Sequence, residues 1–515
     1  MGALGTLGSA AAALPLLAAC QSAAPPTPTA SAPAKPAEAP KPTAAAAAPP
    51  TANAPGSPAP AQASAPAQPP AATQAPAAAG AASAARPTPK PDDFARAAQP
   101  FKGKKVVILM SAGPWGKSHE QILPEFNSLT GMNVVYDMIP EPQISAKLQA
   151  SVLARSGEYD GAVMIWDWMA QYRKAGLIAD LTPYYNDPQF PAFDVDEFPE
   201  KIVNFLRREG KLYGIPVSVA AQIMHYRKDL FEEAGLKPPS QTTGLTWSEV
   251  YDYAKKLTKN NVVGTVHGWL AGGVYSETMN VLPGDKPILD QDKRLSIYRD
   301  PRMVEIYETW ARMYKEGLMH KEVLSLNIYD AWLKFQSGGV AMQPLSWPIS
   351  IAMMEDPDQS KIAGKVGYAP TPGATPRIGG WGCMVMSDSK NREAAYLHLS
   401  WLASGATTVA EVLKHGNYDS SYTKNIQSNL DKYKSEIVKA RKFGASEVEG
   451  MVASWNGIKG GRMVDPETPE FARLGNEMYP HLAKVVTGDA SAKDGLNAAA
   501  DAGEKILAEA GYYKK

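Results

Sequence analysis

Residues 104–110 read Lys-Lys-Val-Val-Ile-Leu-Met, and a short continuous apolar run of this kind is typical of a buried β-strand. A loop over Ser111–Ser118 follows, and a helix is expected from about His119 to Thr130, with Gly131 as its stop. The next strand is predicted at Asn133–Asp137. Two strands joined by a helix are expected to lie parallel in one sheet, because a parallel pair needs a long crossover.

The same order of elements continues along the chain. A helix is predicted over Ile144–Arg155 and a strand over Tyr159–Ile165. Start and stop signals mark further helices, predicted at Trp247–Lys259, Pro301–Glu316, Asn391–Ala403 and Ala492–Ala510. This alternation predicts an α/β fold whose parallel sheet is covered by helices on both faces. The part from Phe101 onward is about 415 residues long, which is enough for two lobes.

The first twenty residues are predicted to be a lipoprotein signal peptide. Residues 17–20 read Leu-Ala-Ala-Cys and close an apolar run that is too short to span a bilayer. No Lys or Arg occurs in residues 1–19, so the usual positively charged start of a signal is missing. Cys20 would be diacylated and become the mature N-terminus, and two acyl chains are enough for a stable membrane anchor.

Residues 21–100 are predicted to be a disordered tether. Ala, Pro, Thr, Ser and Gln make up most of this segment, and its first aromatic side chain is Phe94. Such a composition buries too little apolar area to offset the entropy of ordering. Its prolines favour an extended chain of about 3.1 Å per residue, which reaches on the order of 200 Å.

Charge and cysteine content exclude several classes of function. The 52 Lys and Arg balance the 52 Asp and Glu, which argues against a nucleic-acid binder that needs a basic face. Cys20 and Cys383 are the two cysteines, and Cys383 lies in an apolar run that predicts a buried strand thiol. The seven His show no metal-ligand spacing, so we predict neither a metal nor a cofactor.

The loop at 111–118 differs by one residue from a phosphate-binding P-loop and lies between a strand and a helix. Ser111 replaces the first glycine, whose conformational freedom helps such a loop to wrap phosphates. Pro114 removes one N–H from the backbone that would hold the anion. An exported domain also has little ATP to use. We therefore interpret the loop as the lip of a ligand site that carries Trp115.

Four stretches of the chain carry motifs of a known family. They are Phe126–Val134, Trp168–Pro183, Gly210–Pro216 with His225–Leu236, and Phe335–Met342 followed by Trp347, Gly367–Pro370 and Gly379–Gly382. Together they resemble the family 1 extracellular solute-binding proteins of ABC importers, which include maltose-binding receptors. The resemblance covers nearly all of residues 101–515.

The resemblance implies a type II periplasmic-binding-protein-like fold, in which two lobes, each a parallel-type sheet flanked by helices, are joined by a multi-strand hinge. The first lobe would comprise residues 101–215 and 341–385, and the second lobe residues 216–340 and 386–515. Crossings between the lobes are expected near Ile215–Ser218 and Met342–Leu345.

The implied function is that of a receptor and not of an enzyme. It would be a monomer, lipid-anchored on the outer side of the cell membrane, that captures a sugar, oligosaccharide or polyol and delivers it to the permease of an ABC importer. Two alternatives stay open: a secreted glycan-acting enzyme, which needs two carboxylates at a fixed spacing, and a receptor of the same fold for a non-sugar solute.

The ligand is expected in the cleft between the lobes, beyond the carboxyl ends of the strands. Indole rings stack on the C–H faces of sugars, and hydroxyls need polar partners. Trp115 and Asp167 follow the first and third strands, although Asp167 would serve equally well as a helix cap. Family positions select Trp347 and Trp381, and the remaining candidates are Ser218, Gln222, Trp269, Tyr275 and Trp455. The other tryptophans, Trp310, Trp332 and Trp401, are expected to pack in the core.

Overall fold

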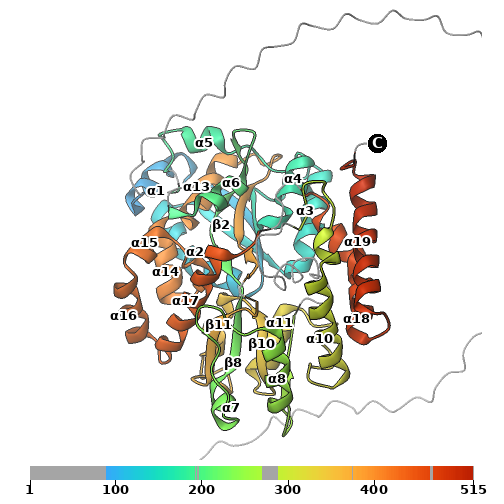
Figure 1. Ribbon diagram of the computed structural model, residues 1–515. Helices are drawn as coiled ribbons and strands as arrows, with labels where there is room; N and C mark the ends of the chain where they lie inside the picture. The colour runs from blue at the N-terminus through green and yellow to red at the C-terminus, as the bar shows by residue number, and fades with distance from the viewer. Residues whose placement is uncertain are drawn as a thin grey trace, which may run out of the picture. The chain divides into compact units, whose positions relative to one another are not determined.

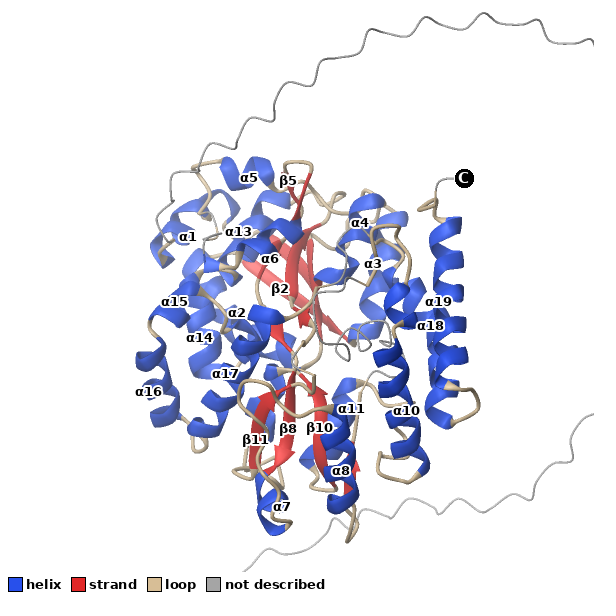
Figure 2. Ribbon diagram, in the orientation of Figure 1, coloured by secondary structure: helices blue, strands red, loops and turns tan. Residues whose placement is uncertain are grey.

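The computed structural model describes residues 89–191, 193, 197–268, 288–373, 375–463 and 468–513. The expected signal peptide, Cys20 and almost all of the tether lie outside these residues, as do Trp269 and Tyr275. Within the described residues the chain forms two lobes, each built on a β-sheet with helices against it (Figures 1 and 2). None of the described helices is both long and apolar enough to cross a membrane.

The first lobe is built on a five-stranded sheet of order β2-β1-β3-β13-β6. Its strands are β1 (Lys105–Ser111), β2 (Asn133–Ile139), β3 (Gly161–Ile165), β6 (Ile215–Pro216) and β13 (Trp381–Val385). β1 runs parallel to β2 and β3, as the sequence pattern predicts. β13 is antiparallel to both β3 and β6, because it enters the sheet from the other lobe. The sheet is therefore mixed, and the expected parallel arrangement holds only for β2, β1 and β3.

The second lobe is built on a four-stranded sheet of order β11-β8-β10-β9. Its strands are β8 (Ile223–Arg227), β9 (Val263–Thr265), β10 (Val340–Ser346) and β11 (Val366–Pro370). β8 is antiparallel to β10 and β11, and β9 is parallel to β10. This pairing corrects the expected return to the first lobe at residue 341. β10 is hydrogen-bonded between β8 and β9, so residues 340–370 belong to the second lobe.

Three crossings connect the lobes. The first runs from β6 to β8 through β7 (Ala220–Ala221), where the sequence places it, and the second runs from β11 to β13 through β12 (Ile378–Gly379). The expected crossing at 342–345 thus lies about thirty-five residues later in the chain. β7 and β12 pair antiparallel, so the two crossings are hydrogen-bonded to each other. The third crossing passes through η6 (Tyr418–Ser420), and its Asp419 carbonyl accepts the Val219 N–H at 2.9 Å.

Helices of the first lobe come from two separate parts of the chain, residues 91–206 and 392–415. They are α1 (Pro91–Ala97), η1 (Gln99–Phe101), α2 (Pro114–Thr130), α3 (Glu141–Leu153), η2 (Trp166–Trp168), α4 (Met169–Lys174), α5 (Thr182–Asn186), α6 (Glu200–Leu206), α13 (Arg392–Leu402) and α14 (Gly405–His415), with the short hairpin β4 (Arg207–Arg208) and β5 (Lys211–Leu212). α13 packs on β1, β3 and β13, and α14 packs on α2. The first lobe therefore continues past the expected boundary at residue 386, as far as the end of α14.

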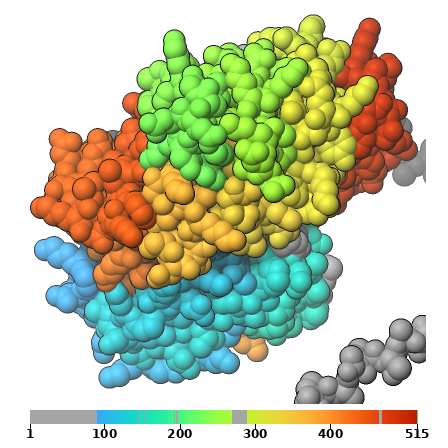
Figure 3. Space-filling view, turned by 90° about the horizontal axis from the view of Figure 1, so that it is seen from below, coloured from blue at the N-terminus to red at the C-terminus, as the bar shows by residue number. Residues whose placement is uncertain are grey.

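The second lobe carries the remaining helices. They are α7 (Lys228–Glu233), α8 (Trp247–Leu257), η4 (Ser296–Arg299), α10 (Pro301–Lys315), α11 (Ile328–Gln336), η5 (Pro348–Ser350), α12 (Ile351–Met354), α15 (Lys424–Ser428), α16 (Leu430–Ala440), α17 (Gly444–Gly460), α18 (Phe471–Thr487) and α19 (Ala492–Glu509). α8 and α11 contact β10, α17 packs on β11, and α10 packs on α18 and α19. In the view from below, the first-lobe residues in blue to cyan and the second-lobe residues in green to yellow form two masses, with residues in gold to orange between them (Figure 3).

Capping residues in the sequence correctly indicated the starts of most of the predicted helices. α8 begins at its predicted residue behind Thr246, whose side chain forms a reciprocal capping box with Glu249. α10 and α19 also begin where predicted, behind the side-chain caps Asp300 and Ser491. α2 is the exception, because it begins at Pro114 and not near His119. The fixed φ of proline suits the first position of a helix, so the predicted loop at 111–118 is largely the first turns of α2.

Candidate functional site

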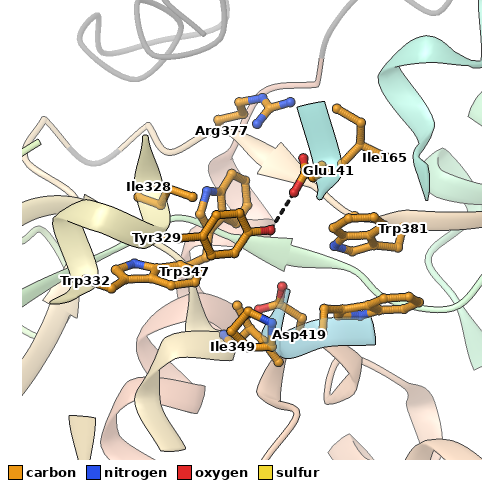
Figure 4. A pocket seen from close by; sticks show the side chains of 14 residues that line it. Glu141, Ile165, Ile328, Tyr329, Trp332, Trp347, Ile349, Arg377, Trp381 and Asp419 are labelled. Atoms are coloured by element: carbon orange, nitrogen blue, oxygen red, sulfur yellow. Dashed lines mark hydrogen bonds between the residues drawn. The ribbon is translucent and has the colours of Figure 1, made fainter. Parts of the chain in front are cut away.

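A cavity opens where the two sheets meet at the crossings (Figure 4). Five aromatic side chains line it, namely Trp115, Tyr329, Trp332, Trp347 and Trp381, together with the ionisable side chains Glu141, Arg377 and Asp419 and the smaller or aliphatic residues Pro114, Ile165, Ile328, Ile349, Gly379 and Gly380. Its volume is ≈ 50 Å³, which is room for a few water molecules. Both lobes and two crossings contribute residues, so this is the cleft in which the sequence places the ligand.

The first-lobe wall of the cavity is a stack of rings. Trp115, in the first turn of α2, lies against Trp381 at the start of β13, with ring centroids 4.8 Å apart and planes 8° from parallel. His119, one turn later on α2, covers the other face of Trp115 at 4.0 Å. Trp115 was expected on a loop. It reaches the cavity from a helix, because Pro114 starts that helix directly after β1.

The second-lobe wall carries three rings, and two of them, Trp332 and Tyr329, are held by hydrogen bonds and an edge contact. The Trp332 Nε1 donates to the Ser346 Oγ at 2.8 Å, and Tyr329 lies edge-on to Trp332 with centroids 5.2 Å apart. Trp347 follows β10, and a Cβ at Gly379 would lie 2.8 Å from its ring. Glycine at position 379 is therefore required for the close approach of the second crossing to this indole.

Asp167 forms a buried ion pair with Arg377 and is not among the cavity-lining residues. It belongs to η2, directly after β3, and Arg377 lies just before β12. Burial raises the pKa of Asp167, and the guanidinium of Arg377 opposes that shift. Arg377 also lies over the Trp347 ring, with its Cζ 5.4 Å from the centroid. Asp167 thus acts on the cavity through the charge and the position of Arg377.

Glu141 connects the two lobes across the cavity. It lies at the start of α3 in the first lobe, and its Oε2 accepts a hydrogen bond of 2.5 Å from the Tyr329 hydroxyl on α11. Burial raises the pKa of Glu141 and, far more, that of Tyr329. Gly113 gives the Tyr329 ring its space, since a Cβ there would lie 2.8 Å from the hydroxyl oxygen. This contact exists only while the lobes are close together.

Asp419 lies on the third crossing. Its Oδ1 accepts the Ile349 N–H at 2.8 Å, which ties the crossing to η5 of the second lobe. Burial raises the pKa of Asp419 to about 7. The cavity therefore holds two carboxyl groups, those of Glu141 and Asp419, in surroundings that disfavour their ionised forms.

The other predicted site residues that the structure describes surround the cavity without lining it. The Ser218 Oγ accepts the Trp381 N–H at 2.9 Å, so this side chain holds the start of β13. Gln222 is buried on the first crossing, and its N–H donates to the Arg377 carbonyl at 3.1 Å. Trp455, on α17, donates its Nε1 to the Ser421 Oγ at 2.9 Å. Trp115, Trp347 and Trp381 are the predicted residues that line the cavity.

Of the eight aromatic or charged residues that line the cavity, the sequence did not single out five. Glu141, Arg377 and Asp419 stand at a helix start or on a crossing, without a motif that singles them out, and Tyr329 lies in an ordinary helical pattern. Trp332 was assigned to the core, and it is buried as expected but also lines the cavity. Trp310 and Trp401 pack in the core, and the buried Cys383 lies on β13, as predicted. The described residues contain no cluster of His, Cys, Asp or Glu that would hold a metal ion.

Comparisons with known proteins agree with this architecture. Residues 111–407 match the family model of the bacterial extracellular solute-binding proteins. A protein of Sinorhizobium fredii, named as a probable amino-acid ABC transporter periplasmic-binding protein, is 23% identical over 322 residues, which are 61% of this chain and 72% of the relative. The mannitol-binding protein of Pseudomonas aeruginosa is 21% identical over 418 residues, 73% of this chain and 87% of the relative. A solute-binding protein of Agrobacterium radiobacter, solved with ribitol, has the same fold, with a TM-score of 0.65 over 79% of this chain and 99% of that structure at 23% identity.

Proposed function

Because this chain belongs to the bacterial extracellular solute-binding protein family, we propose that it captures a sugar or polyol in the cavity between its lobes and delivers it to an ABC-type importer. Membership confirms the resemblance seen in the sequence motifs. Proteins of this family bind solutes without transforming them, so the chain is a binding protein and not an enzyme. Three points are proposals: that the ligand is a sugar or polyol, that an ABC importer receives it, and that a lipid anchors the chain to the membrane.

The single observation that carries the ligand class is the five-ring lining of the cavity. Indole faces pack on the C–H surface of sugars and polyols, and carboxyl and guanidinium groups beside them hydrogen-bond hydroxyls. Two buried indole N–H groups of the lining, those of Trp115 and Trp347, have no hydrogen-bond partner within the described part of the chain. Ligand oxygens would satisfy both donors. The ligands named for two of the proteins compared above, mannitol and ribitol, belong to this chemical class, whereas the Sinorhizobium relative is named for amino acids.

Ligand access requires the lobes to separate. A cavity of ≈ 50 Å³ is smaller than a sugar ring, and the Glu141 contact to Tyr329 closes it. The paired β7 and β12 and the third crossing are the segments about which such a motion would turn. Ligand should then favour the closed form and increase the melting temperature, because it binds only the folded chain. Scattering curves of the chain with and without a bound ligand test the motion, and superimposable curves would argue against it.

Calorimetry with a panel of erythritol, ribitol, mannitol, glucose and maltose tests the ligand class. At least one member should bind, and Trp347→Ala should weaken that binding. Trp168→Ala is the matched control, because it removes an indole of the first lobe that does not line the cavity. Absence of binding to every member of the panel, with the chain folded, would refute a sugar or polyol as ligand.

The membrane anchor is tested separately from the ligand. Cys20 follows Leu17-Ala18-Ala19, and a diacylated residue at this position would tether the binding domain to the membrane through residues 21–100. Cys20→Ser should move the protein from the membrane fraction into the medium or periplasm while leaving ligand binding unchanged. Retention of the variant in the membrane fraction would show that Cys20 is not the anchor.

A further inference from the structure

We propose that the natural ligand carries a cationic amine, as an amino sugar or amino polyol does, and that Glu141 and Asp419 bind its ammonium group inside the ring-lined cavity. This inference rests on the proposed function and narrows its ligand class. It depends on three observations: the balance of charge around the cavity, the free acceptor capacity of the two carboxyl groups, and the aromatic rings beside them.

The charges around the cavity do not balance. Arg377 is the one basic side chain among the lining residues that the structure describes, and it is paired with Asp167 behind the wall. Within the described ranges, the carboxyl groups of Glu141 and Asp419 form no ion pair or hydrogen bond with a basic side chain, and the charge of Arg377 only partly opposes the rise in the pKa of Glu141. Buried carboxylates without a cationic partner are costly. A ligand cation would provide that partner and favour the ionised carboxylates, whereas an anionic ligand would bring a negative charge beside two groups that burial already shifts toward their neutral forms.

Both carboxyl groups retain acceptor capacity toward the cavity. Glu141 accepts one hydrogen bond from the Tyr329 hydroxyl, and Asp419 accepts one from the Ile349 N–H. An ionised carboxylate offers about four lone-pair positions, and an ammonium group offers three donors. Figure 4 shows the Glu141 and Asp419 carboxyl groups at the same cavity as the Tyr329 ring, with Trp347 and Trp381 on either side. An ammonium group placed there could donate hydrogen bonds to both the Glu141 and the Asp419 carboxyl groups.

The aromatic rings of the cavity would also attract an ammonium group. A cation over the face of an indole or phenol ring is attracted by the ring quadrupole, and more strongly where water is excluded. Arg377 already lies over Trp347 in this way, 5.4 Å from the ring centroid. The cavity therefore accommodates positive charge against its aromatic lining. A ligand amine beside Trp381 or Tyr329 would combine this attraction with the carboxyl contacts, and its C–H surface would pack on the remaining rings.

Protonation gives the proposal a thermodynamic signature. Burial raises the pKa values of Glu141 and Asp419, and the charged or titratable groups facing them are Arg377, Asp167 and Tyr329. An ammonium group would favour the ionised carboxylates, so binding should release protons from the protein. Affinity for the amine should then increase from about pH 6 to about pH 8, as long as the ligand amine stays protonated. A neutral polyol should show no such increase.

Three probes with one carbon skeleton test the inference: sorbitol, 1-amino-1-deoxysorbitol and gluconate, each measured by calorimetry at about pH 7.5. The amine should bind about tenfold or more tightly than sorbitol, and gluconate should bind most weakly. Measurement in two buffers of different ionisation enthalpy should reveal proton release for the amine alone. The same comparison with glucose and glucosamine covers a cyclic ligand.

Variants assign the effect to the carboxyl groups. Asp419→Asn and Glu141→Gln should each reduce the advantage of the amine over sorbitol, and the double variant should abolish it. Asp431→Asn, which removes an exposed carboxyl on α16, is the matched control and should leave the advantage intact. If sorbitol or glucose binds as tightly as its amine, the sugar receptor stands and the cationic ligand is refuted. If the advantage survives in the double variant, or if no probe binds the folded chain, the inference is equally refuted, and the last result also counts against the proposed function.

Discussion

The two walls of the cavity are built differently. On the first-lobe wall, the rings of His119, Trp115 and Trp381 lie face against face, at 4.0 Å and 4.8 Å. On the second-lobe wall, Trp332 is held by a hydrogen bond to Ser346, and Tyr329 is held by one to Glu141 of the opposite lobe. The first wall is complete once its lobe has folded, whereas part of the second wall is positioned only when the lobes close.

The difference between the walls predicts which substitutions change stability and which change ligand binding. A ring whose two faces are covered by other rings contributes mainly to the packing of its own lobe. A ring that is fixed at its edge, or through a single hydrogen bond, keeps a face for a ligand. We therefore expect the loss of Trp115 mainly to lower the free energy of unfolding, and the loss of a second-wall ring mainly to lower the affinity for ligand. Loss of Trp381, which is stacked on a single ring, should lower both.

The largest effect should come from Trp115→Ala. Trp115 is 2% exposed and lies between His119 and Trp381, so its removal leaves a cavity within the stack. The free energy of unfolding should fall by about 3–5 kcal/mol. Chemical denaturation measures this loss, and Trp115→Phe, which keeps a ring in the stack, should recover part of it. A loss of ligand affinity at unchanged stability would show that Trp115 is a ligand contact and not a packing residue.

Asp419, which ties the third crossing to the second wall, should make stability depend on pH. Burial raises its pKa to about 7, above the ordinary aspartate value of 3.8. The folded chain therefore keeps a proton that the unfolded chain releases, and the stabilisation is lost as the pH increases from about 4 to about 7. The contribution of this group to the unfolding free energy should fall by roughly 4 kcal/mol over that range.

Asp419→Asn isolates this contribution, because an asparagine keeps an acceptor for the Ile349 N–H and does not titrate. Between about pH 4 and pH 7, the unfolding free energy of the variant should decline less than that of the original chain. Chemical unfolding at several pH values measures both declines. Parallel declines would exclude Asp419 as the titrating group.

Trp347→Ala should affect binding more than stability. A sugar ring that covers about 100 Å² of indole contributes roughly 2.5 kcal/mol at 25 cal/mol/Å². The affinity for the bound sugar or polyol should therefore fall on the order of fiftyfold, as determined by calorimetry. Trp381→Ala should cost similar affinity and, since Trp381 stacks on Trp115, some stability as well. Unchanged affinity in both folded variants would remove these rings from the ligand site.

The smallest effect is expected from Tyr329→Phe. The ring and its packing on Trp332 remain, and only the hydrogen bond to Glu141 across the cleft is lost. Such a bond contributes about 1 kcal/mol, so the affinity should fall by about fivefold and the free protein should be more open in solution scattering. Tyr253→Phe, on α8 away from the cleft, is the control. A more closed free form in Tyr329→Phe would reverse the role that we assign to this contact.

Local patterns in the sequence predicted those parts of the fold that local physics decides. The apolar runs of β1, β2 and β3, the capped starts of α8, α10 and α19, and the burial of Cys383 all follow from periodicity, caps and composition. β10 was placed in the wrong lobe, because it is buried along its whole length and its own sequence does not indicate which sheet it joins. Its hydrogen bonds to β8, which place Met342 opposite Tyr226 from a distant part of the chain, decide the lobe.

The same distinction applies to the residues that line the cavity. The sequence by itself determined that tryptophans follow β1 and β10 and begin β13. The strand before it singled out Trp115, and family position singled out Trp347 and Trp381. Only the tertiary structure decided that Asp167 neutralises Arg377 behind the wall, and that Glu141, Tyr329 and Asp419 meet at the cavity. The sequence gives the type of each side chain but not the residue that it contacts in the fold. Charge pairing, burial and the resulting pKa shifts depend on which distant segments the fold brings within a few ångströms of one another.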